Sequence, residues 1–231
     1  MNKNPLQQYF RQPALYINLP SGNRWYTESD IKSNETGEIA VYGLTAIDDI
    51  MLNTPDAMLN GQALEKVISN CVPDILNVKN ITLGDLDAIF VAIKLATTGQ
   101  GYPIDRDCPS CNKTVDQDLN CRLLLDTMSH IEESDTVLML NQLKVHVSPY
   151  RFYMRHAYMQ RQYIEQSMVN QISDDIDDFT KSQIVAESVE RLSKETFGLL
   201  SNSVVSVELP NGVEVTDKDN IREWMFNICC I

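Results

Sequence analysis

Tight turns between short apolar runs constrain the fold of this chain most. Pro210-Asn211-Gly212 separates the apolar runs 203–209 and 213–215, and Asn141-Gln142 divides the run 137–147. Turns of this kind join neighbouring strands into antiparallel hairpins. We therefore expect small antiparallel sheets, one of them central to the second half of the chain.

The N-terminal segment predicts an extended arm followed by a small sheet. Residues 1–13 hold two prolines among several Asn and Gln side chains, a composition typical of arms that pack on a partner. The segments 15–19 and 24–26, with turn residues between them, predict a hairpin. Residues 39–44 predict a third strand of the same sheet.

Residues 45–98 predict a compact helical block. Thr45 and Thr82 can each cap a helix that begins one residue later, with aspartates in the first turn where the helix dipole favours them. Between these two helices, residues 62–71 carry apolar side chains at helical spacing. Gly99 ends the block.

The last third of the chain predicts two helices, a hairpin and a closing helix. The helical patterns cover about 151–173 and 179–192, and Asp217 can cap a helix over 218–226. The fold class is therefore α+β: small antiparallel sheets and hairpins, a helical block, a cysteine-knuckle hairpin and C-terminal helices. The corresponding segments are 1–44 (arm and small sheet), 45–98 (helical block), 99–150 (cysteine knuckle and hairpin) and 151–231 (helices with terminal hairpin). A domain boundary is expected near residue 100 or 150.

The charge of the chain bears on its partners. Nineteen Lys and Arg against 32 Asp and Glu give a net charge of −13. Such a chain repels nucleic-acid phosphates and anionic lipids, so general nucleic-acid binding is not expected. No apolar run approaches the length of a membrane span and no secretory signal opens the chain, so we expect no membrane insertion and folding in a reducing cytoplasm.

One motif suggests metal chemistry. Cys108-Pro109-Ser110-Cys111 has the two-residue gap that lets both thiolates of a tight turn face one zinc ion, and Cys121 is a third candidate ligand. A structural zinc site needs four ligands, and the fourth is open between Cys71, His130, His146 and a residue of another chain. The alternative is a hairpin turn between two strands that merely retains reduced cysteines. The possible cofactor is thus one structural zinc ion.

Catalytic motifs are missing from the sequence. It contains no GxSxG, HExxH, GxxxxGK[ST] or GxGxxG pattern, so neither a nucleophile turn nor a phosphate-binding loop is indicated. We expect the protein not to be an enzyme. A hydrolase with an unrecognised site would have to depend on a residue such as His146.

A basic and aromatic stretch follows Pro149 in this otherwise acidic chain. Its candidate partner-binding residues are Tyr150, Arg151, Tyr153, Arg155 and Tyr158. Tyrosine and arginine are enriched at the centres of protein interfaces. The alternative is a half-buried amphipathic helix whose arginines pair with the carboxylates of this same chain.

Three strings carry a resemblance to a known family. NPLQQYFRQPALYINLPSG, TAIDDIMLNTPDAMLNGQALEKVISNCVPDI and CPSCNKTVDQDLN resemble the baseplate hub or hub-assembly proteins of T-even-type contractile-tailed bacteriophages. The resemblance covers about the first 150 residues. It implies a non-enzymatic structural or assembly component of the tail baseplate that contacts other tail subunits, located in the virion or in the host cytoplasm during assembly. A zinc-knuckle adaptor is the alternative function.

Overall fold

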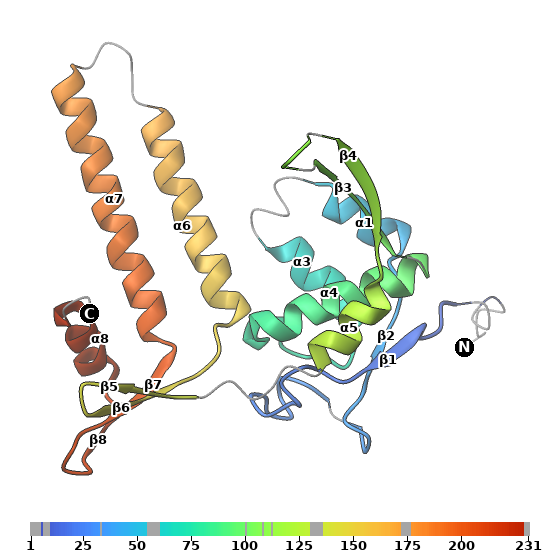
Figure 1. Ribbon diagram of the computed structural model, residues 1–231, viewed down its shortest axis with the longest axis horizontal. Helices are drawn as coiled ribbons and strands as arrows, with labels where there is room; N and C mark the ends of the chain where they lie inside the picture. Colours follow the sequence, from blue (N-terminus) through green and yellow to red (C-terminus); the bar gives the residue numbers. More distant parts are fainter. Residues whose placement is uncertain are drawn as a thin grey trace, which may run out of the picture. The chain divides into compact units, whose positions relative to one another are not determined.

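The chain divides into two compact units, residues 1–133 and residues 134–231, here called the N-terminal and C-terminal units (Figure 1). The computed structural model describes residues 6, 10–32, 34–54, 61–99, 101–107, 109–111, 113–129, 136–171 and 177–228. Its helices and small antiparallel sheets confirm the predicted α+β class. The division lies between the two expected boundary positions, and it separates the cysteine hairpin from the hairpin that follows it.

The small sheet of the N-terminal unit pairs β1 (Leu15–Ile17) with β2 (Ile39–Val41). The strands are antiparallel, with Tyr16 opposite Ala40. The predicted hairpin between 15–19 and 24–26 is wrong, because residues 20–25 form successive turns and contribute no strand.

A buried carboxylate explains the turns. Asp85 is 1% exposed, and its carboxylate accepts hydrogen bonds from the Ser21 N–H, at 2.9 Å, and from the Tyr26 hydroxyl. These contacts hold residues 21–26 against a helix that lies sixty residues away in sequence. The local sequence pattern cannot reveal these hydrogen bonds, because they depend on where Asp85 lies in the folded chain.

The helical block has the predicted elements. They are α1 (Ala46–Leu52), α3 (Gln62–Cys71), the short 3₁₀ helix η2 (Val78–Asn80) and α4 (Leu83–Thr98). Thr45 and Asp48 form a reciprocal capping box at α1, and the Thr82 hydroxyl accepts from the Asp85 N–H at α4. Gly99, with φ of 64°, ends α4 in the left-handed conformation that glycine adopts without steric cost. All of these caps confirm the sequence-based prediction.

The core of the N-terminal unit joins β2 to the helical block. Its fully buried side chains include Ile39 and Val41 of β2, Ile68 of α3, Ile81 and Ile89. Fully burying one such side chain is worth about 1.5–3 kcal/mol. The small sheet therefore owes its position to the helices rather than to its own few hydrogen bonds.

The cysteine turn lies between β3 (Tyr102–Asp107) and β4 (Thr114–Leu119), which pair antiparallel as the turn between two strands predicts. The next element, α5 (Cys121–Ser129), was not expected from the sequence. The Asn120 side chain caps it by accepting from the backbone N–H groups of Arg122 and Leu123, at 3.0 and 3.1 Å. β4 ends at Leu119 and α5 begins at Cys121, so no run of turn-forming residues marks the change from strand to helix.

The C-terminal unit contains a four-stranded antiparallel sheet in the order β5-β6-β7-β8. Its strands are β5 (Val137–Leu140), β6 (Leu143–Val147), β7 (Val204–Glu208) and β8 (Glu214–Val215). Both predicted hairpins are confirmed: Asn141 and Gln142 adopt φ of 48° and 71° at one turn, and Gly212 has φ of 81° at the other.

Two long helices stand between β6 and β7 in the chain. They are α6 (Phe152–Asn170) and α7 (Asp178–Ser201), which pack side by side (Figure 1). α7 continues nine residues beyond the predicted end at Leu192. The closing helix α8 (Lys218–Asn227) is capped by Asp217 as predicted, and its Ile221 joins the small core of the sheet.

Candidate partner-binding site

The start of α6 is fixed to the sheet of the C-terminal unit. Ser148 donates its backbone N–H to the Ser203 carbonyl at 2.7 Å, and the Ser203 hydroxyl contacts the Met154 sulfur at 3.8 Å. Phe152 and Met154 are buried, at 4% and 1% exposure. The start of α6 is therefore anchored to the sheet. Residues 150–158 are here called the platform.

The predicted partner-binding residues all lie on this platform. Arg151 is the N-cap residue of α6, Tyr150 precedes it, and Tyr153, Arg155 and Tyr158 belong to the first two turns. Tyr153 and Arg155 are exposed, whereas the other three are half-buried. The five residues therefore lie at the start of α6, where Tyr153 and Arg155 are open to solvent.

Tyr153 and Tyr158 lie close enough to Tyr150 to influence its hydroxyl group. Burial raises the pKa of Tyr150, and the hydroxyls of Tyr158 and Tyr153 raise it further. Tyr150 therefore stays a neutral hydrogen-bond donor across the physiological range of pH. Neutral phenol groups on a fixed backbone present large contact area at low entropic cost.

The arginines of this region divide between two roles. Arg161 forms an ion pair with Glu195 of α7 at 3.3 Å, which agrees with the alternative of internal pairing. Arg155 is exposed and makes no ion pair with any other described residue. Of these two side chains, Arg155 is the one free to meet a carboxylate of another protein.

The contact between α6 and α7 centres on a buried carboxylate that the sequence did not reveal. Glu165 accepts from Arg191 through both Nε, at 3.1 Å, and Nη2, at 2.9 Å, and from the Ser188 hydroxyl at 2.8 Å. Hydrogen bonds from Arg191 and Ser188 hold the pKa of Glu165 below its ordinary value, against the opposing effect of burial. This polar cluster links the two helices, and the bidentate arginine gives the contact geometric specificity.

The predicted metal ligands have different positions. Cys108 lies outside the described residues, Cys111 is exposed in the turn, and Cys121 is buried with its thiol 3.8 Å from the Leu119 carbonyl oxygen. Among the residues the structure describes, no three potential ligands gather at one point. The zinc site therefore stays a prediction.

The candidates for a fourth ligand are also placed in part. Cys71 is buried in the N-terminal unit, where burial raises the pKa of its thiol, and its sulfur lies 3.9 Å from the Gly43 carbonyl oxygen. His146 lies in the C-terminal unit with Nε2 3.9 Å from the Glu208 carboxylate. His130 lies outside the described residues.

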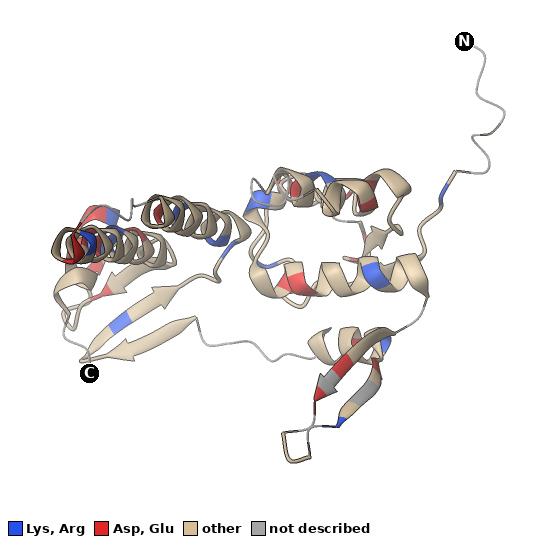
Figure 2. Ribbon diagram, turned by 90° about the horizontal axis from the view of Figure 1, so that it is seen from above, with Lys and Arg blue, Asp and Glu red and all other residues tan. Residues whose placement is uncertain are grey.

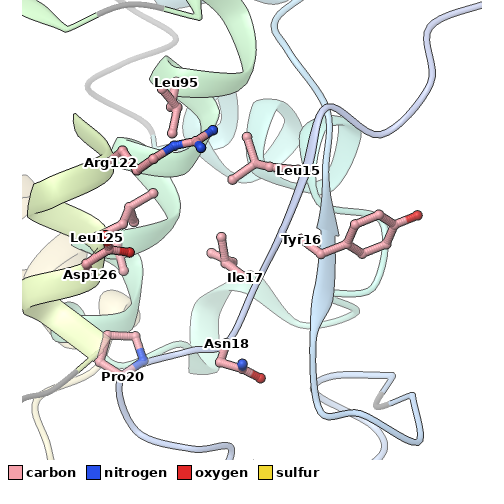
Figure 3. Close-up of a pocket in the computed structure, with 10 residues that line it drawn as sticks. Leu15, Tyr16, Ile17, Asn18, Pro20, Leu95, Arg122, Leu125 and Asp126 are labelled. Atoms are coloured by element: carbon pink, nitrogen blue, oxygen red, sulfur yellow. The ribbon is translucent and has the colours of Figure 1, made fainter. Parts of the chain in front are cut away.

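A cavity of about 410 Å³ opens in the N-terminal unit between β1, α4 and α5 (Figure 3). Leu15 and Ile17 point into it, while Tyr16 points away, as strand alternation requires. Arg122 and Asp126 of α5 are the charged residues of its lining. The lining residues include no histidine, cysteine, serine or threonine.

The arm is tied to its own chain at one point that the sequence did not indicate. Arg11 donates to the carbonyl oxygens of Gly43, at 2.5 Å, and Asn70, at 2.6 Å, and lies 3.7 Å from the Asp48 carboxylate. Its guanidinium group also stacks over the Tyr42 ring, 5.4 Å from the centroid. Arg11 therefore belongs to the folded N-terminal unit.

The fold and these surfaces define an α+β protein whose candidate site is an open basic and aromatic surface. None of the described helices is long and apolar enough to cross a membrane. A family model, T4 bacteriophage base plate protein, matches residues 43–228, which include both units from α1 to α8. The chain belongs to this family of phage baseplate proteins, and the family implies a place in the virion tail. Comparison with curated proteins and with solved structures gives no match.

Proposed function

We propose that this protein is a non-enzymatic component of the baseplate hub of a contractile phage tail, and that it acts by binding other tail subunits. The observation that carries this proposal is the family match over residues 43–228. Mass spectrometry of particles and tail precursors distinguishes a chain that stays in the particle from one that leaves after assembly.

The platform at the start of α6 is the proposed contact with a neighbouring tail subunit. Tyr153 and Arg155 are exposed there on a backbone that Phe152 and Met154 anchor. Interfaces concentrate their binding energy in aromatic and arginine side chains of this kind. The partner surface should offer an apolar pocket with a carboxylate at its edge.

The experiment compares phages that carry single substitutions in this chain. Tyr153→Ala and Arg155→Ala should each reduce the amount of tail subunits that co-purify with the chain, by about tenfold for a central contact. The matched control is Gln162→Ala, which changes an exposed residue of the same helix. Circular dichroism of each purified variant checks that α6 stays folded.

Mass spectrometry of particles and tail precursors separates the two parts of the proposal. A fixed stoichiometry in mature virions makes the chain a baseplate subunit, whereas presence in precursors alone makes it an assembly factor. Absence from both would refute the hub function. Unchanged co-purification in both Tyr153→Ala and Arg155→Ala would refute the contact surface while leaving the hub function intact.

A further inference from the structure

β5 is an edge strand of the four-stranded sheet, and its outer side is open. Among the described strands it stands first in the sheet and pairs with β6 only. Val137, Leu138 and Met139 are exposed, by 38%, 53% and 67%. An exposed apolar strand at the edge of a sheet is a template on which a further strand can pair.

The backbone groups of this edge can be assigned from the pairing of β5 with β6. The Val147 N–H donates to the Thr136 carbonyl at 2.7 Å, so residue 136 directs its backbone groups toward β6. Along an antiparallel strand, successive residues direct their backbone groups to opposite sides. The N–H and C=O groups of Val137 and Met139 therefore face the open edge, where a strand of another molecule can bond to all four.

The opposite edge of the same sheet is blocked against such pairing. Its strand β8 has only two residues, and one of them is Glu214. Short strands and charged side chains are common means by which proteins block an edge. β5 has four apolar residues without a charge or a proline. Of the two edges of this sheet, only the β5 edge is therefore open to a further strand.

The charge around β5 permits a second copy of this chain as the added strand. The β5–β6 hairpin, residues 136–147, contains no acidic residue, and Figure 2 shows it without negative charge. Its Lys144 is paired with Glu208 at 2.9 Å. Acidic residues precede position 136 in the sequence, but two antiparallel copies of β5 enter from opposite ends. Those ends are four residues or about 13 Å apart, more than the Debye length of about 8 Å at physiological salt.

We infer that β5 pairs antiparallel with β5 of a second copy of this chain, so that two four-stranded sheets join into one sheet. A two-fold axis at Leu138 places Val137 of each copy opposite Met139 of the other. Their outward N–H and C=O groups then form four hydrogen bonds, and the two Leu138 side chains meet between these bonded pairs. The joined sheet ends in β8 on both sides, so the association stops at two copies. This inference concerns the isolated chain and does not depend on the proposed hub function.

Sedimentation equilibrium of the purified full-length chain tests the inference. Pairing over four residues buries less than the roughly 800 Å² per partner of a standard interface, so we expect a dissociation constant on the order of 100 μM. Met139→Pro removes an outward N–H but no hydrogen bond to β6, and it should raise the dissociation constant at least about tenfold. Met139→Val is the matched control: it keeps the N–H and an apolar side chain, so its association should equal that of the wild-type chain.

A cross-link tests the register of the two strands. Residues that face each other in a non-hydrogen-bonded antiparallel pair have Cα atoms about 4.5 Å apart, which a disulfide can span. Mild oxidation of Leu138→Cys should therefore join position 138 of one copy to position 138 of the other, as mass spectrometry of the digested dimer can show. Val205→Cys, at an exposed position of the inner strand β7, is the control and should give no link between its own copies.

Circular dichroism of each variant shows whether the sheet and helices are retained. A wild-type chain that stays monomeric well above the expected dissociation constant would overturn the inference. Equal dissociation constants for Met139→Pro and Met139→Val would also overturn it, since the outward N–H would then play no part. So would a dimer of Leu138→Cys that forms no link between the two 138 positions, because the contact would then lie elsewhere.

Discussion

The two units are stabilised in different ways, although both mix helices with antiparallel strands. Among the described residues, eighteen buried apolar side chains lie in the N-terminal unit and six in the C-terminal unit. The N-terminal unit also buries three aspartates whose oxygens all serve its caps and turns: Asp30, Asp48 and Asp85. The C-terminal unit joins its longest helices through the Glu165 cluster and the Arg161–Glu195 ion pair. The N-terminal unit therefore has the larger buried apolar core of the two.

Two tryptophans allow the units to be observed separately. The chain contains only Trp25, in the N-terminal unit, and Trp224, in the C-terminal unit. A Trp224→Phe background makes fluorescence report on the first unit, and a Trp25→Phe background makes it report on the second. Each stability prediction below uses urea unfolding followed by this fluorescence.

The largest effect is expected from Asp85→Ala in the N-terminal unit. The substitution leaves the buried Tyr26 and Thr82 hydroxyls and the Ser21 N–H without their acceptor. Removing one member of a buried charged network costs about 3–5 kcal/mol, so the free energy of unfolding of this unit should fall by that amount. Asp87→Ala changes an exposed residue of the same helix and should shift it by about 0.5 kcal/mol or less. Equal effects of the two substitutions would contradict the role given to Asp85.

A smaller effect is expected from Glu165→Gln in the C-terminal unit. The amide keeps the shape of the side chain but loses the charge that receives both Arg191 hydrogen bonds. The urea midpoint reported by Trp224 should fall. It should fall further than in Glu190→Gln, whose partner Lys194 is exposed. If both substitutions give the same small shift, the buried cluster does not hold the two helices together.

Acid should weaken the N-terminal unit through Asp48. Burial by itself would raise the pKa of Asp48, but hydrogen bonds from Asn70 and Thr45 and the charge of Arg11 hold it below its ordinary value of 3.8. A carboxyl with a lowered pKa stabilises the fold above its ordinary pKa, and this contribution is lost as the pH falls through the lowered value. Asp48→Asn should therefore flatten the decline of stability below about pH 4. Asp49→Asn, at an exposed neighbour, should leave the decline unchanged, and a slope common to both variants would refute the assignment.

The smallest effect on stability is expected at the cysteine turn. If Cys108 and Cys111 hold zinc, native mass spectrometry should show an added mass of one zinc ion that a chelator removes and Cys111→Ser prevents. Chelation should lower the urea midpoint reported by Trp25 and leave that of Trp224 unchanged. If freshly purified chain supplied with zinc shows no added mass, the cysteine turn is an ordinary hairpin turn without a metal ion.

Local chemistry was enough to predict most elements of both units. The caps at Thr45, Thr82 and Asp217 and the turns at Asn141 and Gly212 each depend on residues within a few positions of one another. These contacts are present in the sequence itself, so the predicted helix starts and hairpins are confirmed.

The errors and omissions concern contacts between distant residues. Arg24 to Tyr26 have strand-like composition, but Asp85 draws Tyr26 into a turn. The buried role of Glu165 depends on Arg191, which is 26 residues away. For the candidate site, the sequence indicated the tyrosines and arginines around residue 150. It could not show that Arg161 meets Glu195 while Arg155 stays exposed, because that difference depends on how α7 packs.

The position of Arg11 sets an order of events while the chain is being synthesised. Its hydrogen-bond acceptor on Asn70 is made 59 residues later, so the guanidinium has no complete set of partners when it leaves the ribosome. At roughly 5–20 residues per second, the delay is on the order of 3–12 seconds. During this interval Arg11 can meet other molecules, and its guanidinium group gains all of its hydrogen-bond acceptors only once α3 has been made.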